Sequence, residues 1–277
     1  MHMKTMHKLL RNRKAMVGLI LAAMIVFVAA FAPYLTPYSA DAMDTGQRFE
    51  PPSRAHPMGT DFYGRDVFSR VLFGTRISLW TALVVAGAAT LLGLPMGLAA
   101  GYFGGWTDAL FMRLTDVVFC FPWLLMALTV GSIIGPGVKT VIISLGIVYS
   151  PQVARIARGE AMAVRVREFV EAARASGGGS FRIMLRHVLP NCMAPLIVQF
   201  SLVLGFAVLA EAGISYLGFG IQPPTPSWGL MLSEGRDYMM LAPHISIFPG
   251  IAIMLFVVAY NFLGDGLRDV LDPRMKV

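Results

Sequence analysis

The feature that most constrains this chain is a series of long segments without a single Asp, Glu, Lys or Arg. A helix that crosses a membrane needs about 20 consecutive, mostly apolar residues. None of these segments alternates apolar and polar residues as barrel strands do. Because every backbone polar group must be paired inside the bilayer, we predict six transmembrane helices in an all-α, polytopic membrane protein. The six segments are Ala15–Ala32, Ile77–Thr107, Val117–Val138, Thr140–Ala154, Val188–Ala210 and Ile245–Gly264.

The composition supports a membrane location. Of the 277 residues, 56% are hydrophobic and 14% are charged, whereas a soluble domain carries about 25% charged residues. The net charge of +7 can indicate nucleic-acid binding, but the basic residues cluster beside the apolar segments, as in membrane proteins. We therefore predict contact with membrane lipid and none with nucleic acid. Cys120 and Cys192 lie outside any Cys-x-x-Cys pair, which favours small core residues over metal ligands.

The first apolar segment has two interpretations. Basic residues precede it, and Ala30-Phe31-Ala32 resembles the cleavage site of a signal peptide. However, the segment is long for a signal peptide, and Pro33 directly follows the site at which cleavage would occur. We therefore favour an uncleaved membrane helix. The preceding basic residues are Lys4, Lys8, Arg11, Arg13 and Lys14.

The distribution of basic residues predicts the orientation. With both termini in the cytoplasm, 16 of the 23 Lys and Arg residues lie on the cytoplasmic side and seven on the outer side. The positive-inside rule favours this arrangement. It divides the chain into a cytoplasmic N-terminus with the first helix (1–36), an outer, periplasmic segment (37–76), a transmembrane core (77–266) and a cytoplasmic tail (267–277).

The segment between the fourth and fifth spans predicts a short amphipathic helix on the cytoplasmic side. Apolar residues recur there at helical spacing, and charged residues occupy the other side. Glu171 is spaced to pair with Arg167 or Arg174. Three glycines follow, and Gly177 suits the left-handed conformation that ends a helix. The apolar residues are Val166, Phe169, Val170 and Ala173.

A second short helix is expected after the glycines. Ser180 suits its N-cap, and the helix would span residues 181–188, with Pro190 in the first turn of the fifth span. The result is a pair of short helices joined by a sharp corner, in a loop that covers residues 164–189. Such a loop could fit a partner's cleft or lie on anionic lipid. Physical reasoning alone leaves these two alternatives equal.

Several motifs resemble a known family. Glu171-Ala172-Ala173, Gly177 and Leu189-Pro190 resemble the EAA loop of ABC importer permeases. The run Arg186-His187-Val188-Leu189-Pro190-Asn191 is similar to the dipeptide, oligopeptide and nickel branch, although Ser176 and Gly178 replace that branch's usual leucine and alanine. Three further stretches resemble the same branch in order, so that the likeness covers nearly the whole chain: Gly59–Arg70, Ser215–Gly229 and Gly264–Arg274.

The resemblance implies a type I ABC importer permease fold and a place in the bacterial inner membrane. It implies that this chain forms half of the transmembrane path, together with a sister permease subunit, two ATPase subunits and an external solute-binding protein. Peptides are the expected cargo, with nickel or another small solute as the alternative. The expected ATPase-coupling residues are Glu171, Ala172, Ala173, Arg174 and Gly177.

No nucleotide-hydrolysing motif is present in the sequence. A phosphate-binding P-loop needs Gly-Lys followed by Ser or Thr, and none of the five lysines follows a glycine. His-Glu-x-x-His and Gly-x-Ser-x-Gly are absent as well. We therefore expect a transport subunit without catalytic residues, cofactor or metal of its own, whose ATP is bound by partner subunits.

An ion-coupled secondary transporter is the alternative from a different class. Such proteins carry ionisable residues in the middle of their spans, and here the spans are nearly free of them. Glu211 follows 23 residues without a formal charge and lies near the outer end of the fifth span. It is a candidate for the transport pathway, and its alternative role is to bond a neighbouring helix or the loop that holds Arg236.

Five local expectations concern structure rather than function. Asp66–Leu72 is amphipathic and predicts a surface helix at the outer interface. Pro223–Pro226 predicts a stiff, non-helical outer loop, and Trp228 an anchor at the interface. Two pairs are spaced for ion pairing along a helix: Arg113 with Asp116, and Asp265 with Arg268.

Overall fold

The computed structural model describes residues 12–43 and 45–271, and most of these residues are helical. Lys4, Lys8 and Arg11 of the basic N-terminus, and residues 272–277 of the predicted tail, lie outside the described residues. In chain order the elements are α2 (Arg13–Leu35), α3 (Val67–Phe103), α4 (Gly105–Cys120), α5 (Trp123–Ile134), α6 (Val138–Val164), α7 (Glu168–Ala175), α8 (Ser180–Ile183), the π-helix η1 (Met184–Val188), α9 (Leu189–Tyr216), α10 (Trp228–Gly235), the 3₁₀-helix η2 (Arg236–Tyr238) and α11 (His244–Leu271).

Five helices are long and apolar enough to cross a membrane: α2, α3, α6, the continuous α8–η1–α9 helix and α11. The third predicted span differs from expectation, because it is broken into α4 and α5, which meet at an angle of 89°. Phe121 is extended at the break, as expected for a residue that precedes a proline. Together α4 and α5 make up the sixth candidate span, so the single helix predicted over Val117–Val138 is wrong.

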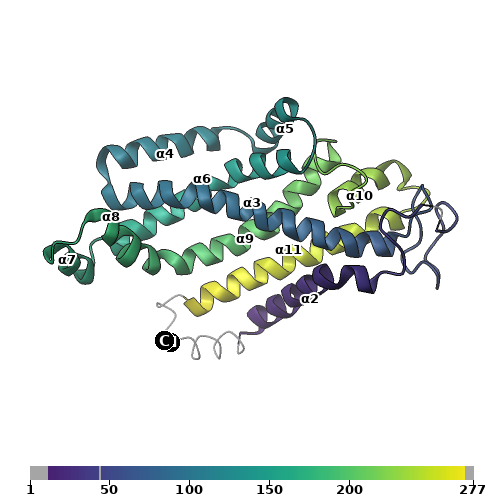
Figure 1. The fold of residues 1–277 in the computed structure, drawn as a ribbon, viewed down its shortest axis with the longest axis horizontal. Helices are drawn as coiled ribbons and strands as arrows, with labels where there is room; N and C mark the ends of the chain where they lie inside the picture. The colour runs from purple at the N-terminus through teal and green to yellow at the C-terminus, as the bar shows by residue number, and fades with distance from the viewer. Residues whose placement is uncertain (1–11, 44, 272–277) are drawn as a thin grey trace.

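The long helices run side by side along the long axis of the molecule (Figure 1). The most extensive helix contact is between α3 and α6, and three glycines spaced four residues apart explain it. A Cβ atom on Gly93, Gly97 or Gly101 would collide with the backbone carbonyl oxygens of α6. Small residues at this spacing let two membrane helices approach closely, so that packing takes the place of the hydrophobic effect.

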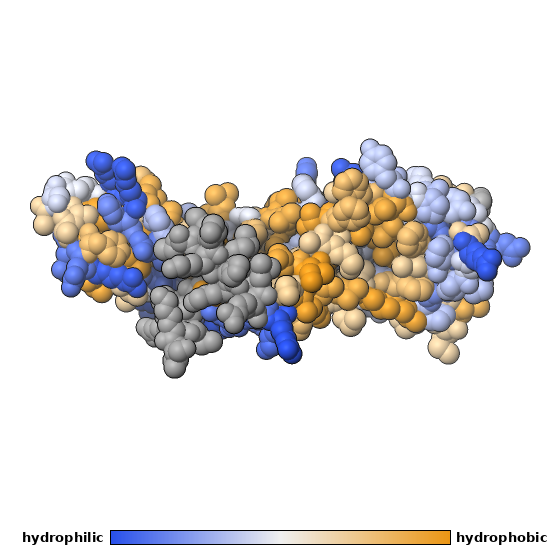
Figure 2. All heavy atoms as spheres, turned by 90° about the horizontal axis from the view of Figure 1, so that it is seen from below, coloured by the Kyte–Doolittle hydropathy of each residue, from blue (hydrophilic) through white to orange (hydrophobic). Residues whose placement is uncertain are grey.

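The two ends of the bundle differ. The first turn of α2, the last turns of α11 and the α7–α8 loop lie toward one end, and the segment before α3 lies with α10 at the other (Figure 1). On the face shown in Figure 2, a band of hydrophobic side chains lies between the two ends, and most of the hydrophilic side chains in view lie toward the ends. This is the surface expected of a protein that crosses a bilayer.

The start of α3 corrects the prediction of a surface helix over Asp66–Leu72. Asp66 caps α3, because its Oδ2 accepts a hydrogen bond of 2.7 Å from the backbone N–H of Ser69. Val67 and Val71 pack against α10 and α11 in one cluster. Arg70, on the side expected to face water, is 1% exposed. Both sides of this turn are therefore covered by protein.

Three other local expectations also differ from the structure. Asp116 accepts a hydrogen bond from Arg155 rather than from Arg113, and within residues 12–271 as described no ion pair joins Asp265 to Arg268. Trp228 is buried, and its indole N–H donates to the carbonyl oxygen of Val71. Pro223–Pro226 is non-helical, as predicted. Cys192 is buried as predicted, whereas Cys120 is exposed.

Candidate functional site

The loop between α6 and α9 is attached to the bundle by apolar contacts on one side of α7. Val170 is fully buried in a cluster that includes residues of α3, α6 and α8. Arg165 fixes the start of the loop, because its Nη1 donates a hydrogen bond of 3.2 Å to the carbonyl oxygen of Tyr102 at the end of α3. These contacts hold α7 in a defined place beyond the end of the long helices.

The glycine corner after α7 has the geometry predicted for Gly177. Gly177 has a φ of +79°, which is accessible to glycine at little cost. Its N–H donates to the carbonyl oxygen of Arg174 at 3.0 Å, and the N–H of Gly178 donates to that of Ala173 at 3.1 Å. This pair of bonds is the Schellman arrangement. A Cβ atom on Gly178 would lie 2.8 Å from the Ala173 oxygen, so glycine is required there as well.

The second short helix is joined to the fifth span rather than separate from it. Gly179 occupies the N-cap position and Ser180 is the first residue of α8, so the predicted capping role of Ser180 is wrong. The helix continues through η1 into α9 without a break. Residues 184–188 form a π-helix, a form that occurs in short segments and often at functional sites.

The predicted coupling residues differ in how far they are exposed. Glu171, Ala172, Arg174 and Gly177 are exposed, whereas Ala173 is half-buried against the core cluster. Among the described residues Glu171 forms no ion pair, so the predicted pairing with Arg167 or Arg174 is absent. The outward surface of α7 is therefore formed by a free carboxylate, a small side chain and a basic side chain.

Four large apolar side chains of the same loop are exposed as well. Val166 is 66% exposed, Phe169 40%, Phe181 67% and Leu185 42%. Exposed apolar side chains in a segment that also carries charged ones fit a surface that binds another protein. We refer to these four residues together with Glu171, Ala172 and Arg174 as the candidate docking surface.

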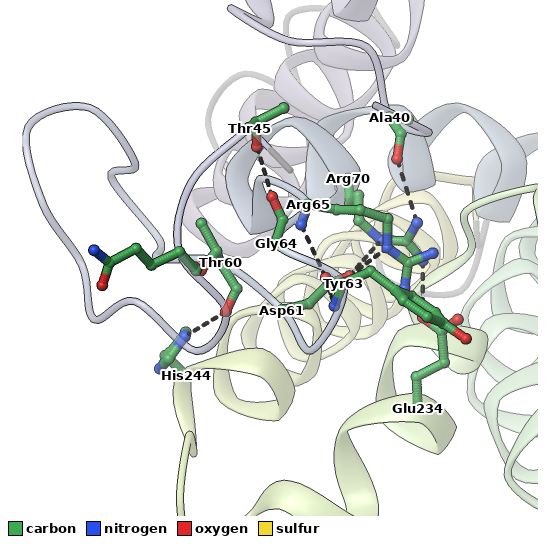
Figure 3. A network of polar contacts seen from close by, with 11 residues as sticks. Ala40, Thr45, Thr60, Asp61, Tyr63, Gly64, Arg65, Arg70, Glu234 and His244 are labelled. Atoms are coloured by element: carbon green, nitrogen blue, oxygen red, sulfur yellow. Dashed lines mark hydrogen bonds and ion pairs between the residues drawn. The ribbon is translucent and has the colours of Figure 1, made fainter. Parts of the chain in front are cut away.

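A second polar cluster lies at the opposite end of the bundle (Figure 3). Arg65 donates to Asp61 at 2.5 Å and to Glu234 of α10 at 3.1 Å, and Arg70 donates to Glu234 at 2.8 Å and to the Ala40 carbonyl oxygen at 3.3 Å. Arg65 and Arg70 are at most 4% exposed. Two arginines and two carboxylates thus neutralise one another and join the segment before α3 to α3 and α10. We refer to these four residues as the outer ion cluster, after the side on which the predicted orientation places them.

Glu211 is buried next to the start of α10. Its Oε1 accepts hydrogen bonds from Ser215 at 2.7 Å and from Ser227 at 3.1 Å, and Ser227 is the N-cap residue of α10. The side chain of Arg236 pairs with Asp237 instead. This placement favours the structural role for Glu211, in which it fixes α10 to α9. The pathway role stays a prediction.

Substitution of Glu211 separates the two roles. Gln keeps an oxygen for both serines, so on the structural role Glu211→Gln should leave uptake near the wild-type level. Glu211→Ala should lower the amount of folded protein, because it leaves two buried hydroxyl groups without an acceptor, at a cost of about 1–3 kcal/mol. Immunoblots of the membranes measure the amount of folded protein, and uptake assays at matched protein levels measure transport. Loss of uptake in a well-folded Gln variant would instead support the pathway role.

A bundle of membrane-length helices with an exposed amphipathic loop at one end is compatible with a transporter's membrane subunit, and comparison with known proteins identifies the family. Residues 93–277 match the model of binding-protein-dependent transport system inner membrane components. Residues 4–52 match the N-terminal transmembrane domain of oligopeptide transport permease C. The chain therefore belongs to the family of binding-protein-dependent transport system inner membrane components.

Curated relatives cover almost the whole chain. A protein of Brucella suis, named as a peptide transport system permease, is 44% identical over 99% of this chain and 92% of its own length. The glutathione transport system permease protein GsiD of Pectobacterium atrosepticum is 42% identical over 97% of this chain and 90% of its own. The dipeptide transport system permease protein DppC of Alkalihalophilus pseudofirmus is 42% identical over 97% of this chain and 88% of its own length.

A solved structure supports the fold. The methionine ABC transporter MetNI, in an inward-facing conformation, contains a chain that matches 73% of this one and 97% of its own length. The TM-score is 0.58 at 19% sequence identity. The predicted type I importer permease fold is thereby confirmed, and the fold is that of a transport subunit.

Proposed function

We propose that this chain is a permease subunit of an ATP-driven importer for peptides in the bacterial inner membrane. The exposed candidate docking surface on α7 carries the proposal, because it places a free carboxylate and apolar side chains where a soluble partner can reach them. The names of the relatives support peptides as the cargo, and the nickel alternative has no such support among those relatives. Membership of the family excludes the ion-coupled alternative.

The proposed complex contains a sister permease subunit, two ATPase subunits and an external solute-binding protein. Glu171, Ala172, Arg174 and Gly177 would contact an ATPase, while Ala173 supports α7 from behind. ATP would be bound and hydrolysed by the ATPases, since this chain has no P-loop. The binding protein would deliver solute at the end of the bundle that holds the outer ion cluster.

The helix geometry suggests how movement would pass from the ATPases to the path. The glycine corner joins α7 directly to α8, and α8 continues through η1 into α9. A displacement of α7 would therefore reach a membrane-spanning helix through the short glycine corner. The π-helical turn at 184–188 is the point at which α9 can adjust, because its hydrogen bonds are already irregular.

Uptake measurements test the transport proposal. Cells that lack this chain should fail to accumulate a radiolabelled dipeptide such as dialanine, and the restored gene should return uptake to the wild-type level. The same cells should show unchanged nickel uptake. If cells without the chain took up dialanine normally but lost nickel uptake, the result would contradict peptide as the cargo and support nickel.

The proposed orientation can be tested with single cysteines. Ala55 is exposed in the outer segment and Ser180 is exposed in the α7–α8 loop. In a chain whose Cys120 is replaced by Ser, a cysteine at Ala55 should react with a membrane-impermeant thiol reagent in cells with a permeabilised outer membrane. A cysteine at Ser180 should react only after the inner membrane is opened. The reverse pattern would place α7 outside the cell and exclude contact with ATPases.

A further inference from the structure

A cavity of about 420 Å³ lies where the segment after α2, the start of α3 and the loop before α10 meet. This volume falls within the range of pockets that hold small molecules. Asp41 and Arg76 bring one negative and one positive side chain to its wall, and both residues are exposed. Within the described part of the chain neither forms an ion pair. The other lining residues are Ser39, Ala40, Phe73, Ile77 and Pro226.

Arg76 marks a boundary between the polar end of the bundle and the part of α3 that suits lipid. It is the last charged residue before the charge-free segment Ile77–Thr107. Trp80, one turn further along α3, is 53% exposed, and tryptophan is enriched where membrane meets water. These two neighbours place the cavity at the level of lipid headgroups.

Beyond Arg76, the exposed side of α3 is apolar. An α-helix advances about 100° per residue, so Trp80, Leu83, Gly87 and Leu91 all lie within about 60° of Arg76 around the axis. Leu83 is 42% exposed and Leu91 75%, and a Cβ atom on Gly87 would meet nothing within 4 Å. We call these four residues the α3 stripe. It runs about 16 Å along the axis, inside the charge-free segment, where a water-soluble partner is not expected.

One cationic and one anionic side chain at the head of an apolar stripe complement a zwitterionic lipid. We propose that the cavity binds the headgroup of a phosphatidylethanolamine, with its phosphate at Arg76, its ammonium at Asp41 and its acyl chains along the α3 stripe. A guanidinium group suits bidentate binding of phosphate oxygens, and an ammonium group has three donors for a carboxylate. The inference goes beyond the proposed function and holds for any cargo.

Photo-crosslinking of lipid to the intact complex tests this proposal. The delipidated complex is incubated with a phosphatidylethanolamine that carries a diazirine in one acyl chain, and mass analysis locates the adduct. The wild type should give an adduct on α3 between Trp80 and Leu91. Arg76→Gln should lower its yield at least about tenfold, because a neutral amide lacks the charge-assisted bonds to phosphate.

Arg48→Gln is the matched control. Arg48 is an exposed arginine of the same outer segment and does not line the cavity, so its replacement should leave the adduct yield at the wild-type level. Equal yields from the wild type and the Arg76→Gln chain would overturn the proposal. A stripe that cross-links to another subunit instead of to lipid would show that protein covers this face, and would overturn it as well.

Competition by unlabelled lipids tests the headgroup. Phosphatidylethanolamine should reduce the adduct several-fold more effectively than phosphatidylcholine, whose ammonium has no N–H, or phosphatidylglycerol, which has no ammonium. Asp41→Asn should abolish this preference. Equal competition by the three lipids would overturn the assignment of Asp41, and competition by inorganic phosphate alone would reveal a site for free phosphate instead of lipid. Each of these outcomes leaves the transport function intact, because dialanine uptake tests that function separately.

Discussion

Replacement of Arg70 by Met should remove most of the folded protein from the membrane. Arg70 is 1% exposed and pairs with Glu234, whose side chain is 13% exposed. Without Arg70, this largely covered carboxylate would have one cationic partner fewer. Removal of one partner from a buried charge network costs about 3–5 kcal/mol, a large share of a total stability of about 5–15 kcal/mol. The amount of inserted protein and its unfolding temperature in detergent measure the effect.

Two variants control this experiment. Arg236→Met breaks an ion pair whose side chains are 50% and 70% exposed, and exposed pairs contribute little, so this variant should resemble the wild type. Adding Glu234→Gln to Arg70→Met removes the unbalanced carboxylate and should recover part of the lost protein. An Arg70→Met chain as stable as the Arg236→Met chain would show that the outer ion cluster does not hold the outer segment in place.

Replacement of Ala172 by Trp should abolish uptake while the chain still inserts and folds. Ala172 is exposed on the outward surface of α7, so the large side chain meets no part of this chain. At a close-packed interface with an ATPase the same side chain would have no room, and overpacking is destabilising. Dialanine uptake and copurification of the ATPases should both fall below detection.

Two variants control for effects of Ala172→Trp on the chain itself. Ala172→Ser keeps the side chain small and should preserve uptake, whereas Ala173→Trp should disturb α7 itself, because Ala173 packs against the core cluster. Normal uptake by the Ala172→Trp chain would exclude a close contact between this side of α7 and a partner.

Much of the fold follows from the positions of charged residues. Where the observed helices differ from the predicted ones, the causes are local. Four of the five long helices were predictable from charge-free segments of membrane length, whereas α6 continues past the short charge-free segment Thr140–Ala154 through Arg155 and Arg158. The break at Phe121-Pro122 lies within a charge-free segment, and hydrophobicity does not distinguish a straight span from a broken one. The sequence feature that indicates the break is Pro122, because proline interrupts helices. The spacing of Gly93, Gly97 and Gly101 likewise indicates a close helix contact that composition alone does not reveal.

The sites were predictable where they depend on neighbouring residues. The glycine corner is a local structure, so the sequence around Gly177 was sufficient to predict its conformation. The outer ion cluster joins Arg70 to Glu234, which is 164 residues away, and no spacing rule connects them. The choice between Ala172 and Ala173 as the outward residue depends on how α7 is rotated against its own core, which only the tertiary structure defines.

Cross-linking from Ala172 tests the central claim most directly. A cysteine at this position, in a chain with Cys120 replaced by Ser, would carry a photoactivatable cross-linker in the assembled complex within native membranes. The proposed function predicts a cross-linked product that contains an ATPase subunit, and no such product from a cysteine at Ala55 in the outer segment. A product with an ATPase from Ala55, or none from Ala172 while the complex remains intact, would contradict coupling through α7.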